Sequence, residues 1–261
     1  MIDRDAIFRG EIVRRDACDA SRALAEIALG HAARAFACDA LALPTLHERC
    51  ADTWNRTCAA RAALAADADA RAASIALACA LGFARESLAF DAARLRVVTP
   101  GAHERAAAAR AYYMHRDTWY GSPAAQVNVW IPLFDVGERD SFAIWPAALG
   151  AHVENDSAAF DYERFTSRGG FQSAAVIDAA YPRALAAAPG TAFRVRASAG
   201  DVVAFAAAHL HATTPNETAR TRLSVDVRFV DLGDHERGAG APDGDNASRG
   251  SALVDYMRGA P

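Results

Sequence analysis

Two histidines and an aspartate have the residue types and the spacing to hold a metal ion. His115 and Asp117 are separated by one residue, and His211 follows at long range. Side chains two positions apart on an extended segment point the same way, so His115 and Asp117 can reach one ion. Two imidazoles and one carboxylate can bind iron(II) on one face and leave the opposite face open for chemistry. The pattern therefore indicates an oxygen-using enzyme.

The third ligand decides how specific this pattern is. A lone His-x-Asp pair also occurs as a surface ion pair of modest value. His209 competes with His211, because both would face the same side of a continued strand. Arg222 follows on the next predicted strand and adds a permanent positive charge.

Composition and charge narrow the class of protein. The chain has 261 residues, of which 52% are hydrophobic and 23% charged, enough to bury a full core. A net charge of -4 without a run of Lys or Arg argues against nucleic acid as a partner. We see neither a secretory signal nor an apolar segment of membrane-spanning length, so we expect a cytoplasmic protein without a membrane partner. The five cysteines lie in the first third and form no Cys-x-x-Cys pair, which predicts reduced thiols.

A change of hydrophobic period divides the chain. Residues 17–93 are rich in Ala, Leu and Arg with apolar residues three and four apart, which predicts about three helices, with breaks at Pro44 and at 67–69. The tail after Leu232 is expected to be mobile, apart from a short helix at 252–257. Short strands without long helices between them predict an antiparallel sandwich or barrel, mainly β with packed N-terminal helices. The predicted strands are 95–98, 111–115, 126–133, 141–145, 193–195, 201–207 and 223–230.

Two predicted strands carry one polar and one apolar face. Gln126, Asn128 and Trp130 share a face. Further along the chain the same alternation places five residues together: Arg220, Arg222, Ser224, Asp226 and Arg228. These faces either meet solvent or line a wet cavity inside the barrel. Trp130 favours the cavity, because an indole is a poor solvent-facing group.

Five segments follow one another along the chain: His115-Arg116-Asp117, the strand 126–133, Gly200-Asp201, His211 with Pro215-Asn216, and Arg222. In this order they resemble the phytanoyl-CoA dioxygenase-like family of iron(II)- and 2-oxoglutarate-dependent oxygenases. The resemblance covers roughly residues 95–231, and its combination of motifs is more specific than any one of them.

The resemblance implies a fold and a division of the chain. The fold would be a double-stranded β-helix (a jelly-roll, cupin-like core) over residues 95–231, with a helical N-terminal part over 1–94. Residues 150–191 would form a lid-like insertion, since long connections in compact domains are often lids or binding loops. The alternative for this insertion is a scaffold loop or a dimer contact. Residues 232–261 would be the tail, and 1–261 a single oxygenase domain.

It also implies roles for individual residues. The iron ligands would be His115, Asp117 and His211, with His211 preferred over His209 because the Pro-Asn turn follows it. Arg222 would bind the distal carboxylate of 2-oxoglutarate, a task for which its planar fork is suited. Four more residues would assist this carboxylate or line the pocket: Thr213, Gln126, Asn128 and Trp130. The chain departs from the family after Trp145-Pro146, where Ala147-Ala148-Leu149 replaces the usual Gly-Ser-His.

The activity implied is an oxidation of a small molecule. Iron(II), 2-oxoglutarate and O2 would be used, succinate and carbon dioxide released, and hydroxylation would be the default outcome. Because Asp117 is present, the position that a halide takes in related halogenases is filled, which argues against halogenation. Two alternatives remain. A cupin-like isomerase or dioxygenase would use similar ligands without needing Arg222, and a non-catalytic binding protein would keep only the barrel. The primary substrate and the oligomeric state are not evident from the sequence.

Overall fold

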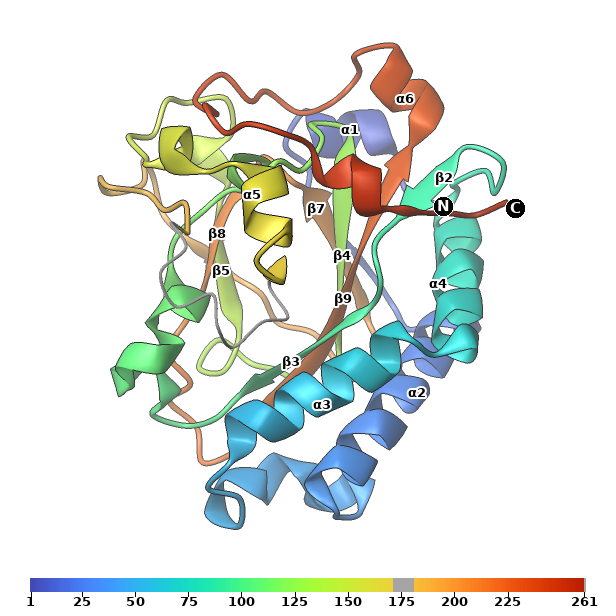
Figure 1. The fold of residues 1–261 in the computed structure, drawn as a ribbon, viewed down its shortest axis with the longest axis vertical. Helices are drawn as coiled ribbons and strands as arrows, with labels where there is room; N and C mark the ends of the chain where they lie inside the picture. Colours follow the sequence, from blue (N-terminus) through green and yellow to red (C-terminus); the bar gives the residue numbers. More distant parts are fainter. Residues whose placement is uncertain (171–180, 261) are drawn as a thin grey trace.

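Two antiparallel sheets form the centre of the molecule (Figure 1). The computed structural model describes residues 1–170 and 181–260. In these residues the larger sheet has seven strands in the order β1-β7-β4-β9-β2-β10, and β3 also pairs with β9. Its strands are β1 (Val13–Arg15), β2 (Leu88–Phe90), β3 (Arg94–Val98), β4 (Gln126–Pro132), β7 (Val202–Ala206), β9 (Arg222–Asp231) and β10 (Met257–Arg258).

The smaller sheet faces one side of the larger one. In the described part of the chain it has three strands, β6 (Phe193–Arg194), β5 (Phe142–Trp145) and β8 (Leu210–Thr213), in that order. Trp130 and Phe205 of the larger sheet pack with Phe142 and Ile144 of the smaller one. The molecule is therefore a mixed α/β protein built around antiparallel sheets.

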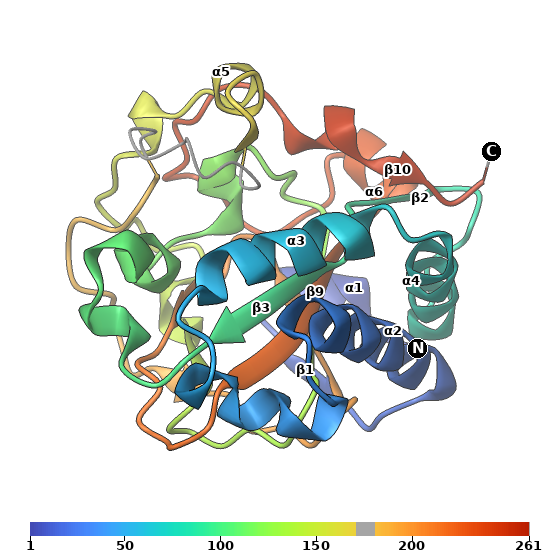
Figure 2. The same ribbon diagram turned by 60° about the horizontal axis from the view of Figure 1, so that its bottom comes forward.

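Helices cover the other face of the larger sheet (Figure 2). Helices α2 and α3 lie across β3 and β9. Along α2, Leu24, Ala28 and Ala32 are fully buried four residues apart, the spacing of one helix face. The α-helices are α1 (Arg4–Phe8), α2 (Asp19–Phe36), α3 (Thr53–Ala65), α4 (Ala68–Leu81), α5 (Tyr162–Thr166) and α6 (Leu232–Glu236).

Local signals explain where the long helices begin and end. Asp67 caps α4 by accepting hydrogen bonds from the backbone N–H groups of Asp69 and Ala70, as the expected break at 67–69 requires. Gly82 ends the helix at φ +100°, a conformation that glycine adopts without strain. Pro44 lies inside a 3-10 helix, η1 (Ala40–Glu48), between α2 and α3.

Side chains along β4 and β9 alternate between the hydrophobic core and the pocket. Val127 and Val129 of β4 and Leu223 and Val225 of β9 are buried in the core cluster that includes the helices. The intervening polar residues point to the opposite face, toward the smaller sheet. The cavity interpretation is therefore confirmed for most of these polar faces. Arg220 is the exception, because its side chain is exposed. The residues that line the pocket are Asn128, Trp130, Arg222, Asp226 and Arg228.

Several expectations about local structure were wrong. Residues 111–115 are not a strand: 3-10 helix η3 (Ala106–Tyr112) extends into this segment, and His115 makes only an isolated bridge to His211. A five-residue alternation could not reveal that His115 alone would pair with β8, which lies at an edge of the smaller sheet. Strands β1 and β2 lie inside the segment predicted as helical, because short strands lack a detectable period.

The tail and the insertion also carry more structure than expected. The short helix expected at 252–257 is present as the 3-10 helix η9 (Ala252–Asp255). Helix α6 and strand β10 in the tail were not expected. In the insertion, Phe160, Tyr162 and Phe165 are buried in the core cluster, as in a scaffold loop. Residues 171–180 of the predicted lid lie outside the described residues. No helix in the described part of the chain has both the length and the apolar character needed to cross a membrane.

Candidate metal centre and pocket

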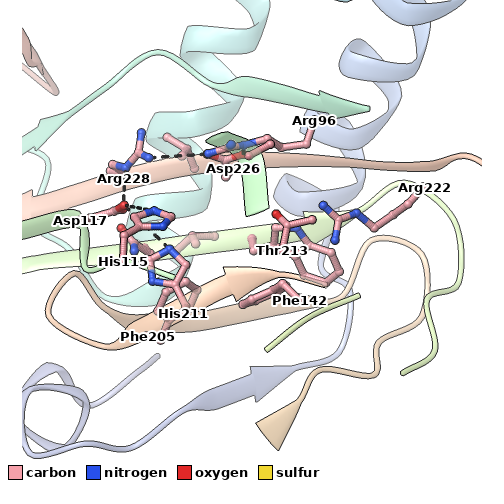
Figure 3. A pocket seen from close by; sticks show the side chains of 15 residues that line it. Arg96, His115, Asp117, Phe142, Phe205, His211, Thr213, Arg222, Asp226 and Arg228 are labelled. Atoms are coloured by element: carbon pink, nitrogen blue, oxygen red, sulfur yellow. Dashed lines mark hydrogen bonds and ion pairs between the residues drawn. The ribbon is translucent and has the colours of Figure 1, made fainter. Parts of the chain in front are cut away.

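His115, Asp117 and His211 converge at one point between the two sheets. The Nε2 atoms of His115 and His211 lie 3.5 Å and 3.8 Å from the Oδ1 atom of Asp117. Their potential ligand atoms all lie within 4.8 Å of one another. Figure 3 shows the three side chains meeting at one end of a pocket. The arrangement is a possible metal site, made of two imidazoles and one carboxylate.

Backbone hydrogen bonds bring these distant segments together. The N–H groups of His115 and His211 each donate to the carbonyl of the other residue, both at 2.9 Å. The Asp117 N–H donates to the Ala207 carbonyl at 2.9 Å. Arg116 between the ligands is extended, with φ -107° and ψ 143°, so His115 and Asp117 project to the same side. The spacing of the three side chains is thus set by main-chain contacts.

Both imidazoles are oriented as metal ligands commonly are. The Nδ1–H of His115 donates to the Tyr113 carbonyl at 2.7 Å, and that of His211 donates to the His209 carbonyl at 2.9 Å. A carbonyl can only accept, so Nδ1 carries the proton in each ring and the Nε2 lone pair faces the cluster. Such a second hydrogen bond fixes the tautomer and the ring direction of metal-binding histidines. The donor set therefore fits a divalent cation.

The site favours a neutral imidazole beside an ionised carboxylate. Burial, with the nearby His115, lowers the pKa of His211 to about 3, so the ring stays unprotonated. Burial by itself would raise the pKa of Asp117, but the positive charge of Arg228, which is the largest opposing cause, holds it well below its usual range. Both groups are in the protonation state that a metal requires.

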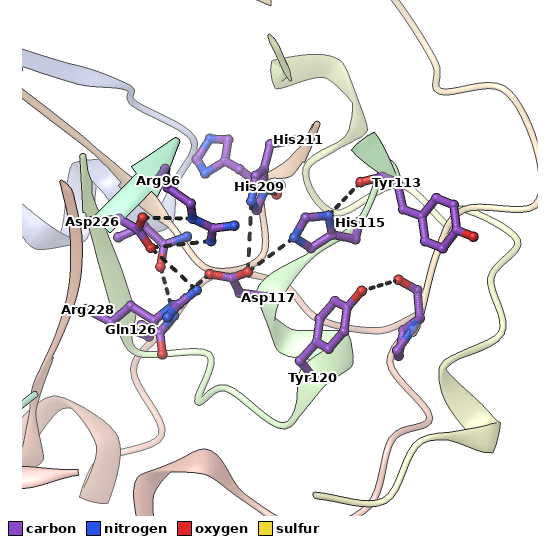
Figure 4. Close-up of polar contacts among 12 residues, drawn as sticks. Arg96, Tyr113, His115, Asp117, Tyr120, Gln126, His209, His211, Asp226 and Arg228 are labelled. Atoms are coloured by element: carbon purple, nitrogen blue, oxygen red, sulfur yellow. Dashed lines mark hydrogen bonds and ion pairs between the residues drawn. The ribbon is translucent and has the colours of Figure 1, made fainter. Parts of the chain in front are cut away.

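Arg228 binds the second oxygen of the Asp117 carboxylate. Its Nε donates to Asp117 Oδ2 at 3.1 Å, and its NH1 donates to Asp91 Oδ2 at 2.7 Å. Asp91 Oδ1 in turn accepts from the Arg228 backbone N–H at 2.9 Å. Because Oδ2 is occupied, Asp117 presents Oδ1 to the two histidines (Figure 4). This contact was not anticipated from the sequence, although Arg228 had been placed on the polar face of its strand.

Arg222 and Thr213 line the same pocket, away from the His-Asp-His cluster (Figure 3). The Arg222 NH1 donates to the Ser141 carbonyl at 2.6 Å, while its buried Nε has no hydrogen-bond partner among the described residues. Burial lowers the pKa of Arg222 to about 10, so it remains charged near neutral pH. A buried cation with a free donor is suited to bind an anion.

The remaining candidate residues divide into two groups. Asn128 and Trp130 line the pocket. Gln126 is not one of the lining residues: its amide donates to Asn128 Oδ1 at 2.8 Å, and its Oε1 accepts from the Tyr256 hydroxyl. His209 points away from the cluster, where its Nδ1 accepts from the Ala206 N–H at 3.1 Å. The structure therefore brings His211, and not His209, to His115 and Asp117.

The sequence analysis missed a second set of charges in the pocket. Arg96 of β3 and Asp226 of β9 both line it, and the Arg96 Nε donates to Asp226 Oδ1 at 2.9 Å. Asp226 stood on the polar face of a predicted strand, but no motif indicated Arg96. Only the pairing of β3 with β9 shows that the two residues are neighbours.

Arg116, between His115 and Asp117, is anchored by the C-terminal segment. Its Nε donates to Asp245 Oδ2 at 3.1 Å, and the side chains are 1% and 3% exposed. Asp245 also accepts from the Trp119 indole at 3.0 Å and from the Val153 N–H at 3.1 Å. The tail thus holds the loop that carries His115 and Asp117.

We expect Asp245→Ala to lower the free energy of unfolding by about 3 kcal/mol, because it leaves a buried guanidinium without its counter-charge. Denaturant unfolding monitored by circular dichroism measures the change. The matched control is Glu217→Ala, whose carboxylate lies 3.8 Å from Arg139 on the surface and should matter little. Equal stability of the two variants would contradict an anchoring role for Asp245.

Comparisons with known proteins reveal similarity in structure. No protein-family model matches the chain, and no curated protein matches its sequence. The non-heme monooxygenase ThoJ, in its apo form, is similar with a TM-score of 0.50 and 16% identity, over 88% of this chain and 77% of that one. This similarity shows a shared fold.

Two further solved structures are less similar. The epimerase SnoN, in complex with Fe3+, alpha ketoglutarate and nogalamycin RO, has a TM-score of 0.46 and 18% identity, over 87% of this chain and 82% of that one. EvdO2 from Micromonospora carbonacea var. aurantiaca, complexed with 2-oxoglutarate, has a TM-score of 0.42 and 15% identity, over 65% of this chain and 62% of that one. The chain therefore spans less than two thirds of the length of EvdO2.

Proposed function

We propose that this protein is an iron(II)- and 2-oxoglutarate-dependent oxygenase of the phytanoyl-CoA dioxygenase-like family. The observation that carries the proposal is one pocket with His115, Asp117 and His211 at one end and the partly unpaired Arg222 elsewhere in its lining. The fold shared with the non-heme monooxygenase ThoJ supports it. The two facing antiparallel sheets support a double-stranded β-helix over residues 95–231, within a single domain.

Each part of the site has a task in this chemistry. Iron(II) would be held by His115, Asp117 and His211, and Arg222 with Thr213 would bind the distal carboxylate of 2-oxoglutarate. When bound, the metal and the keto acid supply the activation of O2 and the oxidative decarboxylation that yields succinate and carbon dioxide. Trp130, Phe142 and Phe205 form an aromatic wall that limits water near the reacting groups. We propose hydroxylation of a small molecule as the outcome, since Asp117 fills the position that a halide would take.

Anaerobic addition of iron(II) and then 2-oxoglutarate tests the proposal. A keto acid chelated to a ferrous ion gives a visible charge-transfer band. We therefore expect a band that appears only when both iron(II) and 2-oxoglutarate are added, and whose intensity saturates at one equivalent of iron per chain. Succinate in place of 2-oxoglutarate is the control, because it lacks the keto group. Iron binding without a band would favour the cupin-like alternative, and absence of iron binding would favour a non-catalytic protein.

We expect Arg222→Ala to raise the 2-oxoglutarate concentration needed for half-maximal band intensity by about 10- to 100-fold, the loss expected for a charge-assisted contact. Iron binding should persist, because Arg222 contacts none of the three proposed ligands. Arg220→Ala is the matched control, since Arg220 is exposed and pairs with Asp140 at 3.6 Å. An unchanged 2-oxoglutarate requirement in Arg222→Ala would argue against this role.

A further inference from the structure

Arg96 is a second arginine of the pocket, and it is more accessible than its neighbours. Its side chain is 34% exposed, against 11% for Arg228. Figure 4 shows the Arg96 guanidinium beside Asp226 and on the same side as Asp117. It lies on β3, so it enters the pocket from a different strand than Arg222 and Arg228.

Asp226 uses one edge of this guanidinium and leaves another edge available. The Arg96 Nε and NH2 donate to the two oxygens of Asp226 at 2.9 Å and 3.4 Å. A guanidinium carries five N–H donors, so the edge formed by NH1 and the second N–H of NH2 is still available. Among the described residues, the NH1 group has no hydrogen-bond partner. Asp226 thus fixes the orientation of the Arg96 guanidinium. The outer edge of this guanidinium can bind a planar anion through two hydrogen bonds.

The charges of the pocket leave one positive charge in excess. Its lining holds three guanidinium groups, those of Arg96, Arg222 and Arg228, and two carboxylates, those of Asp117 and Asp226. Behind the lining, Asp91 and Arg94 lie 3.8 Å apart and cancel each other. A bound iron(II) and a bound 2-oxoglutarate dianion would also cancel, so the loaded pocket would still carry one positive charge. A substrate with one negative charge balances it.

Part of the pocket lining is aromatic. The ring centroids of Trp130 and Phe142 lie 5.1 Å apart, and those of Phe142 and Phe205 lie 5.7 Å apart. All three rings line the same pocket as Arg96. A ligand that fills the pocket therefore meets both a cation and an aromatic surface.

We propose that Arg96, oriented by Asp226, binds a carboxylate of the primary substrate, and that the substrate is a small monocarboxylate with an apolar body. This proposal rests on the proposed function, because the assignment of Arg222 to 2-oxoglutarate leaves Arg96 to bind the primary substrate. The carboxylate is held end-on by the free edge of the guanidinium, and the apolar body packs against the aromatic wall.

Matched acids and amides test this assignment. The probes are 3-phenylpropanoate against 3-phenylpropanamide, and hexanoate against hexanamide, added to the protein loaded anaerobically with iron(II) and 2-oxoglutarate. We expect the acids to raise the thermal unfolding midpoint at concentrations about tenfold lower than the amides require. After air is admitted, the acids should stimulate succinate release with the same concentration advantage over the amides. Amides that match or exceed the acids would overturn the proposal.

The variant Arg96→Gln should remove the difference between acid and amide, while the 2-oxoglutarate titration of the charge-transfer band stays as in the unmodified protein. Arg96→Lys keeps the positive charge but loses the planar guanidinium, so its preference for acids over amides should be intermediate. This second variant tests the proposal if Arg96→Gln folds poorly. The control is Arg196→Gln, which also breaks an arginine–carboxylate pair but on the surface. A weakened 2-oxoglutarate titration in Arg96→Gln would make Arg96 a cosubstrate residue and refute its assignment to the substrate.

The two proposals fail in different ways. If the charge-transfer band never forms, the proposed function fails. The acid and amide pairs can then still be compared by thermal shift on the metal-free protein, where the free edge of Arg96 is already in place. A preference for acids that Arg96→Gln abolishes would support the anion site even then, and absence of that preference would remove it.

Discussion

His211→Ala is expected to abolish iron-dependent turnover of 2-oxoglutarate, with a loss of at least about 100-fold in succinate release, because two ligands hold a ferrous ion poorly. Bound iron per chain, measured after desalting, should fall in parallel. The metal-free variant should keep its fold, since the imidazole removed is neutral and contributes no buried charge. Thermal unfolding of the metal-free protein checks that point.

His209→Ala is the matched control for this variant. His209 lies two residues earlier on the same segment, and its imidazole packs against Phe205, with its Nδ1 bonded to the Ala206 N–H. Its removal should lower stability and weaken turnover while iron binding and the charge-transfer band remain. If His209→Ala lost the iron and His211→Ala retained it, the ligand assignment would be reversed.

Arg228→Met should lower the free energy of unfolding of the metal-free protein by about 3–5 kcal/mol, because it leaves buried carboxylates without their shared cation. Those carboxylates are Asp117 at 3.1 Å and Asp91 at 2.7 Å. A bound dication replaces part of the lost positive charge beside Asp117. The variant should therefore gain more stability from iron(II) or a substitute such as nickel(II) than the unmodified protein does.

Urea unfolding with and without the metal measures both effects. Arg196→Met is the control, because Arg196 is 69% exposed and its pair with Glu138 at 2.9 Å lies on the surface. We expect it to change stability little and to leave the response to metal unaltered. Arg228→Met with the stability of this control, or with no extra gain from metal, would rule out the role of Arg228 as the counter-charge of Asp117.

Much of the secondary structure was predictable because it follows from local periodicity. The alternation over Gln126–Pro132 and Arg222–Asp231 separates buried apolar residues from pocket residues, and the structure has strands there. The helical period before residue 94 likewise matches α2, α3 and α4. The strand predicted over 111–115 is absent, because its first two residues form the end of a 3-10 helix and only His115 bridges to another strand.

The amino-acid sequence by itself determined which ligand types are present, their order along the chain, and which side chains share a strand face. Those properties depend only on residue identity and on the two-residue period with which side chains alternate along a strand. Only the tertiary structure decided that His211 meets Asp117 while His209 turns away, because mutual hydrogen bonds between the His115 and His211 backbones set the register. It also decided that Arg228 holds Asp117 and that Asp226 orients Arg96. Each pair joins two different elements that are distant in the chain. A local sequence pattern does not encode which of these charges become neighbours in a buried pocket of low dielectric constant.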